Sequence, residues 1–278
     1  MVKAIFVDLD GTLLDGEKRV TEATLEALNK CKEIGIKIFA ATGRPPTLNK
    51  MFPPDEKFIA LFDGGTYHNG GCVIVGEKRF ETYVPEGVVR GVFGLAKTYA
   101  STNVTLQLAG DAHAFWYPLE DSAYRQWGIK KEETVTIEEA LGQNIVKMIV
   151  FHENLNGPPS GKAAEMLDAG LLAKTKRICE GKALTFYNDA IGTAVTVNAP
   201  DADKKDGVEK IRARLGLGKD EIAVFGDDVN DVGMLSAFPL SFAMGNAADS
   251  VKSAAWRVIP DNDSDGIAHA LREVLRLI

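Results

Sequence analysis

The sequence contains few cysteines and few histidines. Its 278 residues include three cysteines, Cys31, Cys72 and Cys179, which are widely separated and form no CxxC pair. This usage is typical of reduced, buried thiols, and it argues against disulfides. The four histidines have no mutual spacing of the kind that zinc ligands show. We therefore expect neither a disulfide framework nor a zinc site.

Signals for membranes and secretion are also lacking. No stretch of about 18 consecutive apolar residues occurs, so no transmembrane helix is predicted. The opening MVKAIFVDLDGT has no charged leader followed by an apolar run and a small-residue cleavage site. These absences predict a cytoplasmic protein that binds no membrane.

Positive charge is in deficit, with 32 Lys and Arg against 39 Asp and Glu, a formal charge of −7 and a pI of about 5.3. A nucleic-acid binder needs a concentrated basic face, so no nucleic-acid partner is expected. The nucleotide-binding loops G-x-x-x-x-G-K-[ST] and G-x-G-x-x-G are absent as well. An anionic substrate would need a local cation or a metal ion.

The length corresponds to roughly two domains at about 150 residues each. At both ends of the chain, short apolar runs alternate with helical periods. Val2 to Val7 reads as a strand buried on both faces, Thr21 as a helix cap, Gly35 as a helix stop, and Ile36 to Ala41 as a second strand. Such a strand–helix–strand unit is a parallel crossover. The last third continues in this way, with strands expected at 222–225, 240–244 and 256–259, and helices at 208–215, 231–238 and 267–277.

The middle of the chain has a different pattern. Short alternating runs at 104–108, 112–117, 146–151 and 184–187 predict a mostly antiparallel sheet, with helices at 86–100 and 161–172 and a loop at Asn154–Ser160. The fold class is therefore α/β, a Rossmann-like doubly wound parallel-sheet core with an inserted α+β domain. We place the core at 1–84 and 186–278, and the insertion at 85–185.

Polar residues follow each predicted core strand. Asp8-Leu9-Asp10-Gly11-Thr12 follows the first strand, and Thr42, Asp227-Asp228 and Asn246 follow three others. Active sites of open parallel sheets lie at the carboxyl ends of the strands. Asp8 and Asp10 point to the same side if the chain stays extended there. A lone Asp-x-Asp-Gly could be only a turn, but turns would not require the whole set.

These motifs resemble the haloacid dehalogenase (HAD) superfamily, in the Cof-type sugar-phosphatase subfamily. The matching segments, in order, are DLDGTLL from Asp8, ATGRP from Ala41, KKDGV from Lys204, FGDDVND from Phe225, AMGNA from Ala243 and DSDG from Asp263. The insertion matches by position the cap called C2, but no cap motif names a substrate. In Lys204-Lys205 the offsets of the following helix favour Lys204 as the family lysine, with Lys205 as the alternative.

The resemblance implies a role for each residue. Asp8 is the expected nucleophile, which forms an aspartyl-phosphate. Asp10 is the expected general acid and then general base, and this requires a protonated Asp10 beside an ionised Asp8. Thr42 is expected to bond a phosphoryl oxygen, and Lys204 to balance the negative charge. Substrate or phosphate contacts are expected at Leu9, Gly43, Arg44 and Asn246.

The implied cofactor is Mg²⁺, which suits an all-oxygen site. Its expected ligands are Asp8, the backbone carbonyl of Asp10, and Asp227. Asn230 and Asp231 are expected to contact the ion directly or through a ligand, without a ranking between them, and Asp228 is a secondary candidate. Three other residues stay open: Asn69 is either a pocket or a turn residue, and Trp116 and Tyr117 either face a substrate or pack the cap sheet.

The function that follows is Mg²⁺-dependent hydrolysis of small phosphomonoesters, sugar phosphates first, by a monomer or weak homodimer. A phosphomutase or phosphotransferase would show the same core motifs, so only its products would distinguish it. A non-enzymatic phospho-accepting module is a third reading. Receiver domains of that kind are shorter, lack a cap and have no second aspartate like Asp10 to activate water.

Overall fold

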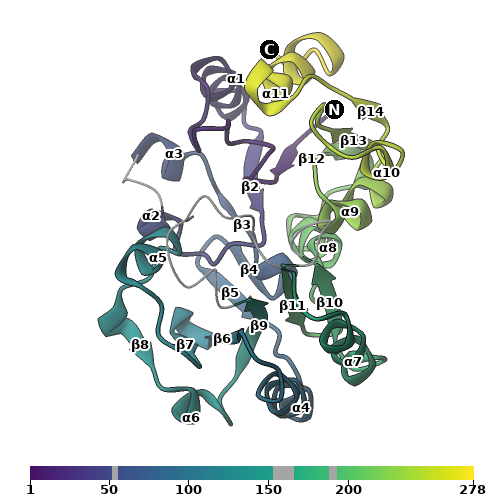
Figure 1. Cartoon of the computed structure of the whole chain (residues 1–278). Helices are drawn as coiled ribbons and strands as arrows, with labels where there is room; N and C mark the ends of the chain where they lie inside the picture. Colours follow the sequence, from purple (N-terminus) through teal and green to yellow (C-terminus); the bar gives the residue numbers. More distant parts are fainter. Residues whose placement is uncertain (52–55, 153–165, 188–192) are drawn as a thin grey trace. The chain divides into compact units, whose positions relative to one another are not determined.

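The computed structural model divides the chain into two units, each with its own sheet (Figure 1). It describes residues 1–51, 56–152, 166–187 and 193–278. The first unit comprises Met1–Arg44, Asp55–Phe80 and Asp203–Ile278, and the second comprises Pro45–Pro54 and Glu81–Ala202. The expected α/β class, a parallel-sheet core with an inserted α+β unit, is confirmed.

An eight-stranded sheet forms the first unit, in the order β14-β13-β12-β1-β2-β3-β4-β5. Its strands are β1 (Ala4–Val7), β2 (Lys37–Ala41), β3 (Gly64–Tyr67), β4 (Cys72–Val75), β5 (Lys78–Glu81), β12 (Ile222–Gly226), β13 (Leu240–Ala243) and β14 (Arg257–Val258). The run from β14 to β3 is parallel, and β4 pairs antiparallel with β3. Every residue of β1 and β12 is buried, because helices cover both faces of a parallel sheet.

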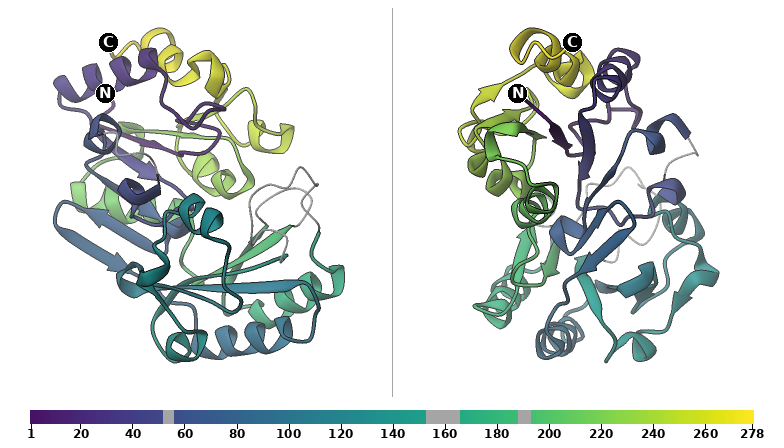
Figure 2. Two further views of the ribbon diagram at one scale, coloured as in Figure 1. Left: turned by 60° about the vertical axis from the view of Figure 1, so that its left-hand side comes forward. Right: turned by 180° about the vertical axis from the view of Figure 1, so that it is seen from behind.

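The helices of the first unit are α1 (Glu22–Glu33), α3 (Glu56–Ala60), α8 (Lys204–Leu215), α9 (Val232–Ala237), α10 (Asp249–Lys252) and α11 (Gly266–His269). Thr21 caps α1 as expected, since its hydroxyl accepts a hydrogen bond from the Thr24 amide at 3.3 Å. The expected closing helix begins as α11 and continues as a π-helical turn over Ala270–Val274. It packs beside α1, near both termini of the chain (Figure 2).

A six-stranded sheet forms the second unit, in the order β10-β11-β9-β6-β7-β8. Its strands are β6 (Thr102–Leu108), β7 (His113–Phe115), β8 (Thr134–Val135), β9 (Ile145–His152), β10 (Leu184–Tyr187) and β11 (Ala194–Asn198), and its helices are α2 (Leu48–Met51), α4 (Glu86–Ala96), α5 (Asp121–Gln126), α6 (Ile137–Ala140) and α7 (Ala169–Cys179). The pairing is antiparallel except between β7 and β8.

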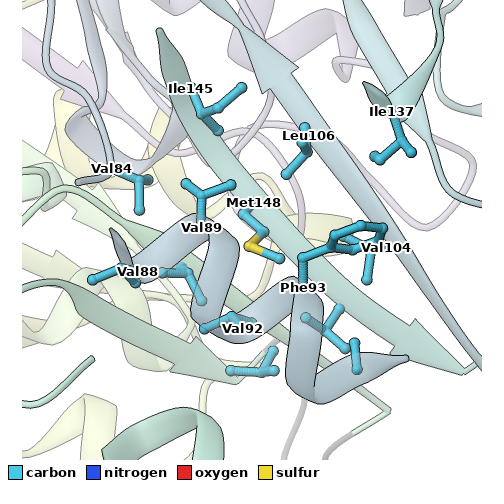
Figure 3. Packing of buried hydrophobic residues seen from close by; sticks show 14 of the residues in the cluster. Val84, Val88, Val89, Val92, Phe93, Val104, Leu106, Ile137, Ile145 and Met148 are labelled. Carbon is cyan, nitrogen blue, oxygen red and sulfur yellow. The ribbon is translucent and has the colours of Figure 1, made fainter. Parts of the chain in front are cut away.

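One face of this sheet carries the core of the second unit. Val88, Val92 and Phe93 of α4 pack onto Val104 of β6 and Met148 of β9 (Figure 3). All five side chains are at least nine-tenths buried, and burying one such side chain fully contributes roughly 1.5–3 kcal/mol. Helices α4 and α7 lie side by side on this apolar face (Figure 2).

The division of the chain differs from the expected one near residue 185. β11 (Ala194–Asn198) was not predicted, and it pairs with β9 and β10 of the second sheet. The second unit therefore continues to Ala202 and does not end at residue 185. The helix expected at 161–172 begins, within the described residues, at Ala169 and extends to Cys179. The loop expected at Asn154–Ser160 lies outside the described residues.

The packing of Trp116 and the lengths of the helices in the described ranges can be compared with the sequence predictions. Trp116 packs edge-on against Phe93 at 5.7 Å between ring centroids and stacks on Tyr117 at 4.4 Å. Packing therefore accounts for Trp116. None of the helices in these ranges has both the length and the apolar content that crossing a bilayer requires.

Candidate active site

The buried pair of Asp8 and Lys204 lies at the centre of the site. Asp8 follows β1 directly and is 5% exposed. Lys204 is the first residue of α8, and its Nζ lies 2.8 Å from Oδ1 of Asp8 and 2.8 Å from Oδ1 of Asp231. The adjacent Lys205 instead pairs with Asp206 at 3.4 Å and is 40% exposed. Of the two lysines left open by the sequence, Lys204 is the one that contacts Asp8.

The charges of this pair depend on each other. Burial lowers the pKa of Lys204, but Asp231 and Asp8 outweigh burial and raise it above its ordinary value, so the ammonium is retained. Burial raises the pKa of Asp8 well above its usual range. Lys204 opposes that shift, and the carboxylates of Asp231 and Asp227 add to it. The carboxylates around Asp8 therefore carry more negative charge than Lys204 alone balances.

Asp227, which directly follows the neighbouring strand β12, adds a further carboxylate beside Asp8. Thr12 donates a hydrogen bond to its Oδ1 at 2.6 Å, and the Asn246 amide, after β13, donates to its Oδ2 at 3.3 Å and to the carbonyl of Gly11 at 2.9 Å. Gly11 has φ +78°, and a Cβ there would lie 2.3 Å from Oδ2 of Asp227. A glycine is therefore required for the two strand ends to approach so closely.

Asp231 holds the loop after β12 in place. It is fully buried, and its Oδ2 accepts hydrogen bonds from the amides of Asp227 and Asp228, each at 3.1 Å. Its Oδ1 accepts from Lys204. Both oxygens are thus engaged in shaping the loop and placing the lysine. Asp228 caps the same loop by accepting from the Val229 amide at 2.7 Å.

The carboxylates of Asp8, Asp227 and Asp231 together fit a metal ion. Each offers an oxygen, and these three atoms lie within 4.8 Å of one another. Burial raises the pKa of Asp227 to about 6; the Thr12 hydrogen bond opposes this, and Asp231 adds to it. A divalent cation would relieve that crowding of negative charge, and an all-oxygen donor set suits Mg²⁺. Asp231 is fully buried and binds two loop amides and Lys204, whereas Asp227 is partly exposed, so Asp8 and Asp227 are the better candidates for direct ligands.

Asp10 is held away from this cluster by two cations. Arg44 donates from Nε to Oδ2 at 2.5 Å and from Nη2 to Oδ1 at 2.6 Å, and Lys18 donates to Oδ1 at 2.9 Å. Burial raises the pKa of Asp10, but Arg44 and Lys18 outweigh it and lower the pKa to about 2. The expected acid role needs a proton on Asp10, and this arrangement disfavours that proton, because the cations contact Asp10 while carboxylates surround Asp8.

The segment after β2 lies beside these groups. Thr42 is buried, and its hydroxyl accepts a hydrogen bond from the Arg44 amide at 3.1 Å. Gly43 lies against the side chain of Asn69, which would be 2.9 Å from a Cβ at that position. Asn230 donates to Oδ1 of Asn69 at 3.1 Å. The side chain of Leu9 is fully buried, so only its backbone is available to a ligand.

Sequence reasoning missed two of these residues. Thr12 lies within the quoted motif and bonds Asp227, so the motif itself could have identified it. Lys18 lies eight residues after Asp10, in a loop where it adopts φ 61°. No periodicity or motif marks it, because its contact with Asp10 depends on how that loop folds back.

The sequence profile of the haloacid dehalogenase-like hydrolases matches residues 5–271. The match covers nearly the whole chain, so the chain belongs to this hydrolase family. The resemblance drawn from the motifs is thereby confirmed.

Two phosphatases match this chain over nearly their whole length. The chain is 25% identical over 276 residues to the 5-amino-6-(5-phospho-D-ribitylamino)uracil phosphatase YitU of Bacillus subtilis, covering 98% of this chain and 97% of that protein. It is 28% identical over 270 residues to the phosphoglycolate phosphatase of Archaeoglobus fulgidus, covering 97% and 96%. A solved sugar phosphatase of HAD subclass IIB superposes with a TM-score of 0.81 at 25% identity, covering 99% of this chain and 100% of that one.

Proposed function

We propose that the chain is a Mg²⁺-dependent phosphomonoesterase that hydrolyses small phosphate esters, sugar phosphates first, through an aspartyl-phosphate on Asp8. The observation that carries the proposal is the buried contact of Asp8 with Lys204 beside Asp227, with Asp10 two residues further on. The phosphatase relatives support the phosphate ester as the substrate, and the sugar phosphatase of similar fold supports the sugar.

In the first step an oxygen of Asp8 attacks phosphorus. A bond forms between that oxygen and phosphorus, the ester P–O bond breaks, and the departing alkoxide takes a proton from Asp10. Asp10 starts ionised, since Arg44 and Lys18 keep its pKa low, so it first takes that proton from solvent water once Arg44 has released its carboxylate. The phosphoryl oxygens of the substrate compete for Arg44, because a guanidinium pairs equally well with phosphate.

In the second step water hydrolyses the aspartyl-phosphate. Asp10, now ionised, takes a proton from the attacking water, the bond between phosphorus and Asp8 breaks, and inorganic phosphate leaves. The hydroxyl of Thr42 and the ammonium of Lys204 stabilise the charge that develops on the phosphoryl oxygens in both steps. This second use of Asp10 separates a phosphatase from a module that merely stores the phosphoryl group.

The metal would be held by the carboxylates of Asp8 and Asp227 and the backbone carbonyl of Asp10, with Asn230 and Asp231 in supporting positions. When bound, Mg²⁺ supplies positive charge that offsets the phosphate and the clustered carboxylates. Gly43, Arg44 and Asn246, with the backbone of Leu9, are the proposed contacts to substrate. The second unit is proposed as the cap that sets specificity. The partner is a small phosphate ester, and we propose a cytoplasmic monomer or weak homodimer.

Phosphate release from a panel of sugar phosphates, phosphoglycolate, nucleotides and p-nitrophenyl phosphate tests the proposal. We expect free phosphate, and loss of its release in EDTA with recovery on adding excess Mg²⁺. Full activity in EDTA would remove the metal from the mechanism. Transfer of the phosphoryl group to a second sugar, with no release of free phosphate, would indicate a phosphomutase or phosphotransferase instead.

A further inference from the structure

The turn between β3 and β4 adopts an unusual backbone conformation. Three consecutive residues have positive φ: His68 at 52°, Asn69 at 55° and Gly70 at 102°. Positive φ is costly for residues other than glycine, and asparagine tolerates it better than most. A strained turn persists only where its surroundings stabilise it. The contacts of this turn therefore show which parts of the site stabilise it.

The backbone of this turn is bonded to the segment after β2. The His68 amide donates to the carbonyl of Arg44 at 3.0 Å, and the Asn69 amide donates to the carbonyl of Thr42 at 3.0 Å. Thr42 is in turn bonded to the carbonyl of Thr66 in β3 at 2.9 Å. The positive φ values thus direct two successive amides toward the carbonyls on either side of Gly43.

The side chain of Asn69 makes two further contacts. It lies over Gly43, so close that a Cβ there would meet its Oδ1 at 2.9 Å. The same Oδ1 accepts the hydrogen bond from Nδ2 of Asn230. Asn69 is only 5% exposed, so the amide is enclosed by these partners. One side chain therefore joins the segment after β2 to the loop after β12.

The tip of the turn reaches a third part of the site. A Cβ at Gly70 would lie 2.1 Å from the carbonyl oxygen of Asp203, the residue just before Lys204. Only glycine permits that approach. The turn therefore touches the three segments that carry Thr42, Lys204 and Asn230.

We propose that Asn69 is a positioning residue that fixes the Thr42-Gly43-Arg44 segment and the amide of Asn230 relative to each other. The inference rests on the proposed function, since these segments are the ones assigned to phosphate and metal. The contacts of Asn69 are with Gly43, Asn230 and the carbonyl of Thr42, and among the hydrogen bonds of the described residues none joins it to Asp8 or Asp10. With Nδ2 of Asn230 held by Asn69, its Oδ1 is left as a buried acceptor that has no hydrogen-bond partner within the described ranges. The hydrogen bond from Nδ2 of Asn230 to Asn69 fixes the orientation of the Asn230 amide, and so it also fixes the direction in which Oδ1 of Asn230 points.

The variant Asn69→Gly separates the side chain from the backbone, because glycine keeps the positive φ at no steric cost. We expect kcat for p-nitrophenyl phosphate to fall by about tenfold or more with KM changed less than about threefold, since misplaced groups reduce the rate more than binding. Ser101→Gly in the second unit is the matched control, because Ser101 also has a positive φ, 57°. It should leave both constants unchanged.

Hydrogen exchange gives a readout that needs no turnover. In Asn69→Gly we expect the amides of residues 42–44 to exchange about threefold faster or more than in the parent, because the support over Gly43 is gone. Ser101→Gly should match the parent. Unchanged exchange and unchanged kcat in Asn69→Gly would overturn the proposal, and Asn69 would be only a turn residue.

A double variant tests the link to Asn230. If Asn69 acts partly through Asn230, adding Asn69→Gly to Asn230→Ala should cost less in kcat than Asn69→Gly costs alone, since coupled residues are not additive. Full additivity would contradict the link. A parent enzyme that releases no phosphate from any ester would refute the proposed function, and hydrogen exchange would still decide whether Asn69 holds the segment.

Discussion

The contact of Arg44 with Asp10 lowers the pKa of Asp10 and so disfavours the protonated form that the acid step needs. The pair is bidentate, and the side chain of Arg44 is only 19% exposed. Charge-assisted forks of this kind are among the stronger hydrogen bonds in proteins. The proposed exchange of Arg44 from Asp10 to the substrate phosphate therefore makes binding of substrate a condition for the acid step.

The variant Arg44→Gln tests this exchange at the scale of one residue. A hydrogen bond to a charged group contributes about 1.5–3 kcal/mol, so we expect KM for p-nitrophenyl phosphate to rise by about tenfold to a hundredfold. Michaelis–Menten kinetics at fixed Mg²⁺ measures it. Arg19→Gln, at an exposed arginine that pairs with Glu17, is the control. An unchanged KM in Arg44→Gln would show that Arg44 does not bind the phosphate.

The sequence predicted which residues meet at the site better than it predicted their charges. Asp8, Asp227 and Lys204 could be predicted because each lies at a strand end or helix start within a motif. The protonation of Asp10 could not be predicted, because it depends on Lys18 and Arg44, whose distances from Asp10 depend on loop conformation. Local spacing contains no information on such contacts.

At the scale of elements, β7 of the second unit contains a buried titratable residue. His113 is 3% exposed. Burial lowers its pKa to about 4; a hydrogen bond to the carbonyl of Asp111 opposes this, and Lys147 and Lys50 add to it. The folded protein therefore keeps His113 neutral at a pH where the unfolded chain, with a pKa near 6.5, takes up a proton.

This difference predicts how stability depends on pH. Above about pH 7 His113 is neutral in both states and does not reduce the free energy of unfolding. As the pH falls from 7 toward 4 the free energy of unfolding decreases, because the unfolded state binds the proton first. Between pH 7 and pH 5 the loss should be about 2 kcal/mol. Denaturant unfolding followed by tryptophan fluorescence measures it, since Trp116 and Trp127 both lie in the second unit.

The matched variant is His113→Gln, which cannot titrate. The quantity to compare is the change in unfolding free energy between pH 7 and pH 5, and not the stability at one pH. This change should be smaller in His113→Gln than in the parent. His269→Gln, at an exposed histidine, should keep the parent's slope. Equal slopes in the parent and in His113→Gln would contradict a neutral buried His113.

Elements with strong patterns were predicted well. β1 and β12 are continuous apolar runs because both of their faces are covered, and such runs are recognisable in the sequence. β11 was missed, although Val195, Thr196 and Val197 are β-branched. A five-residue strand has little pattern of its own, and its place in the second sheet is set by pairing with β9 and β10.

At the scale of the whole molecule, the change of pattern in the middle of the chain predicted a core interrupted by an insertion. The first unit is assembled from separate stretches of the chain, and its sheet places β12, more than 200 residues away in sequence, directly beside β1. That adjacency brings Asp227 to Asp8. The exact boundary of the second unit was not predicted, because it depends on which sheet β11 joins.

The central claim is that Asp8 is the nucleophile. Asp8→Asn keeps the size of the side chain and leaves an oxygen for Lys204 to bond, so the fold should survive, as circular dichroism and thermal unfolding would show. Asp15→Asn is the matched control, since Asp15 caps an exposed turn in the same unit. With p-nitrophenyl phosphate and Mg²⁺, we expect kcat to fall by at least about a thousandfold in Asp8→Asn and to stay unchanged in Asp15→Asn. Turnover near the parent's rate in a folded Asp8→Asn protein would contradict the account.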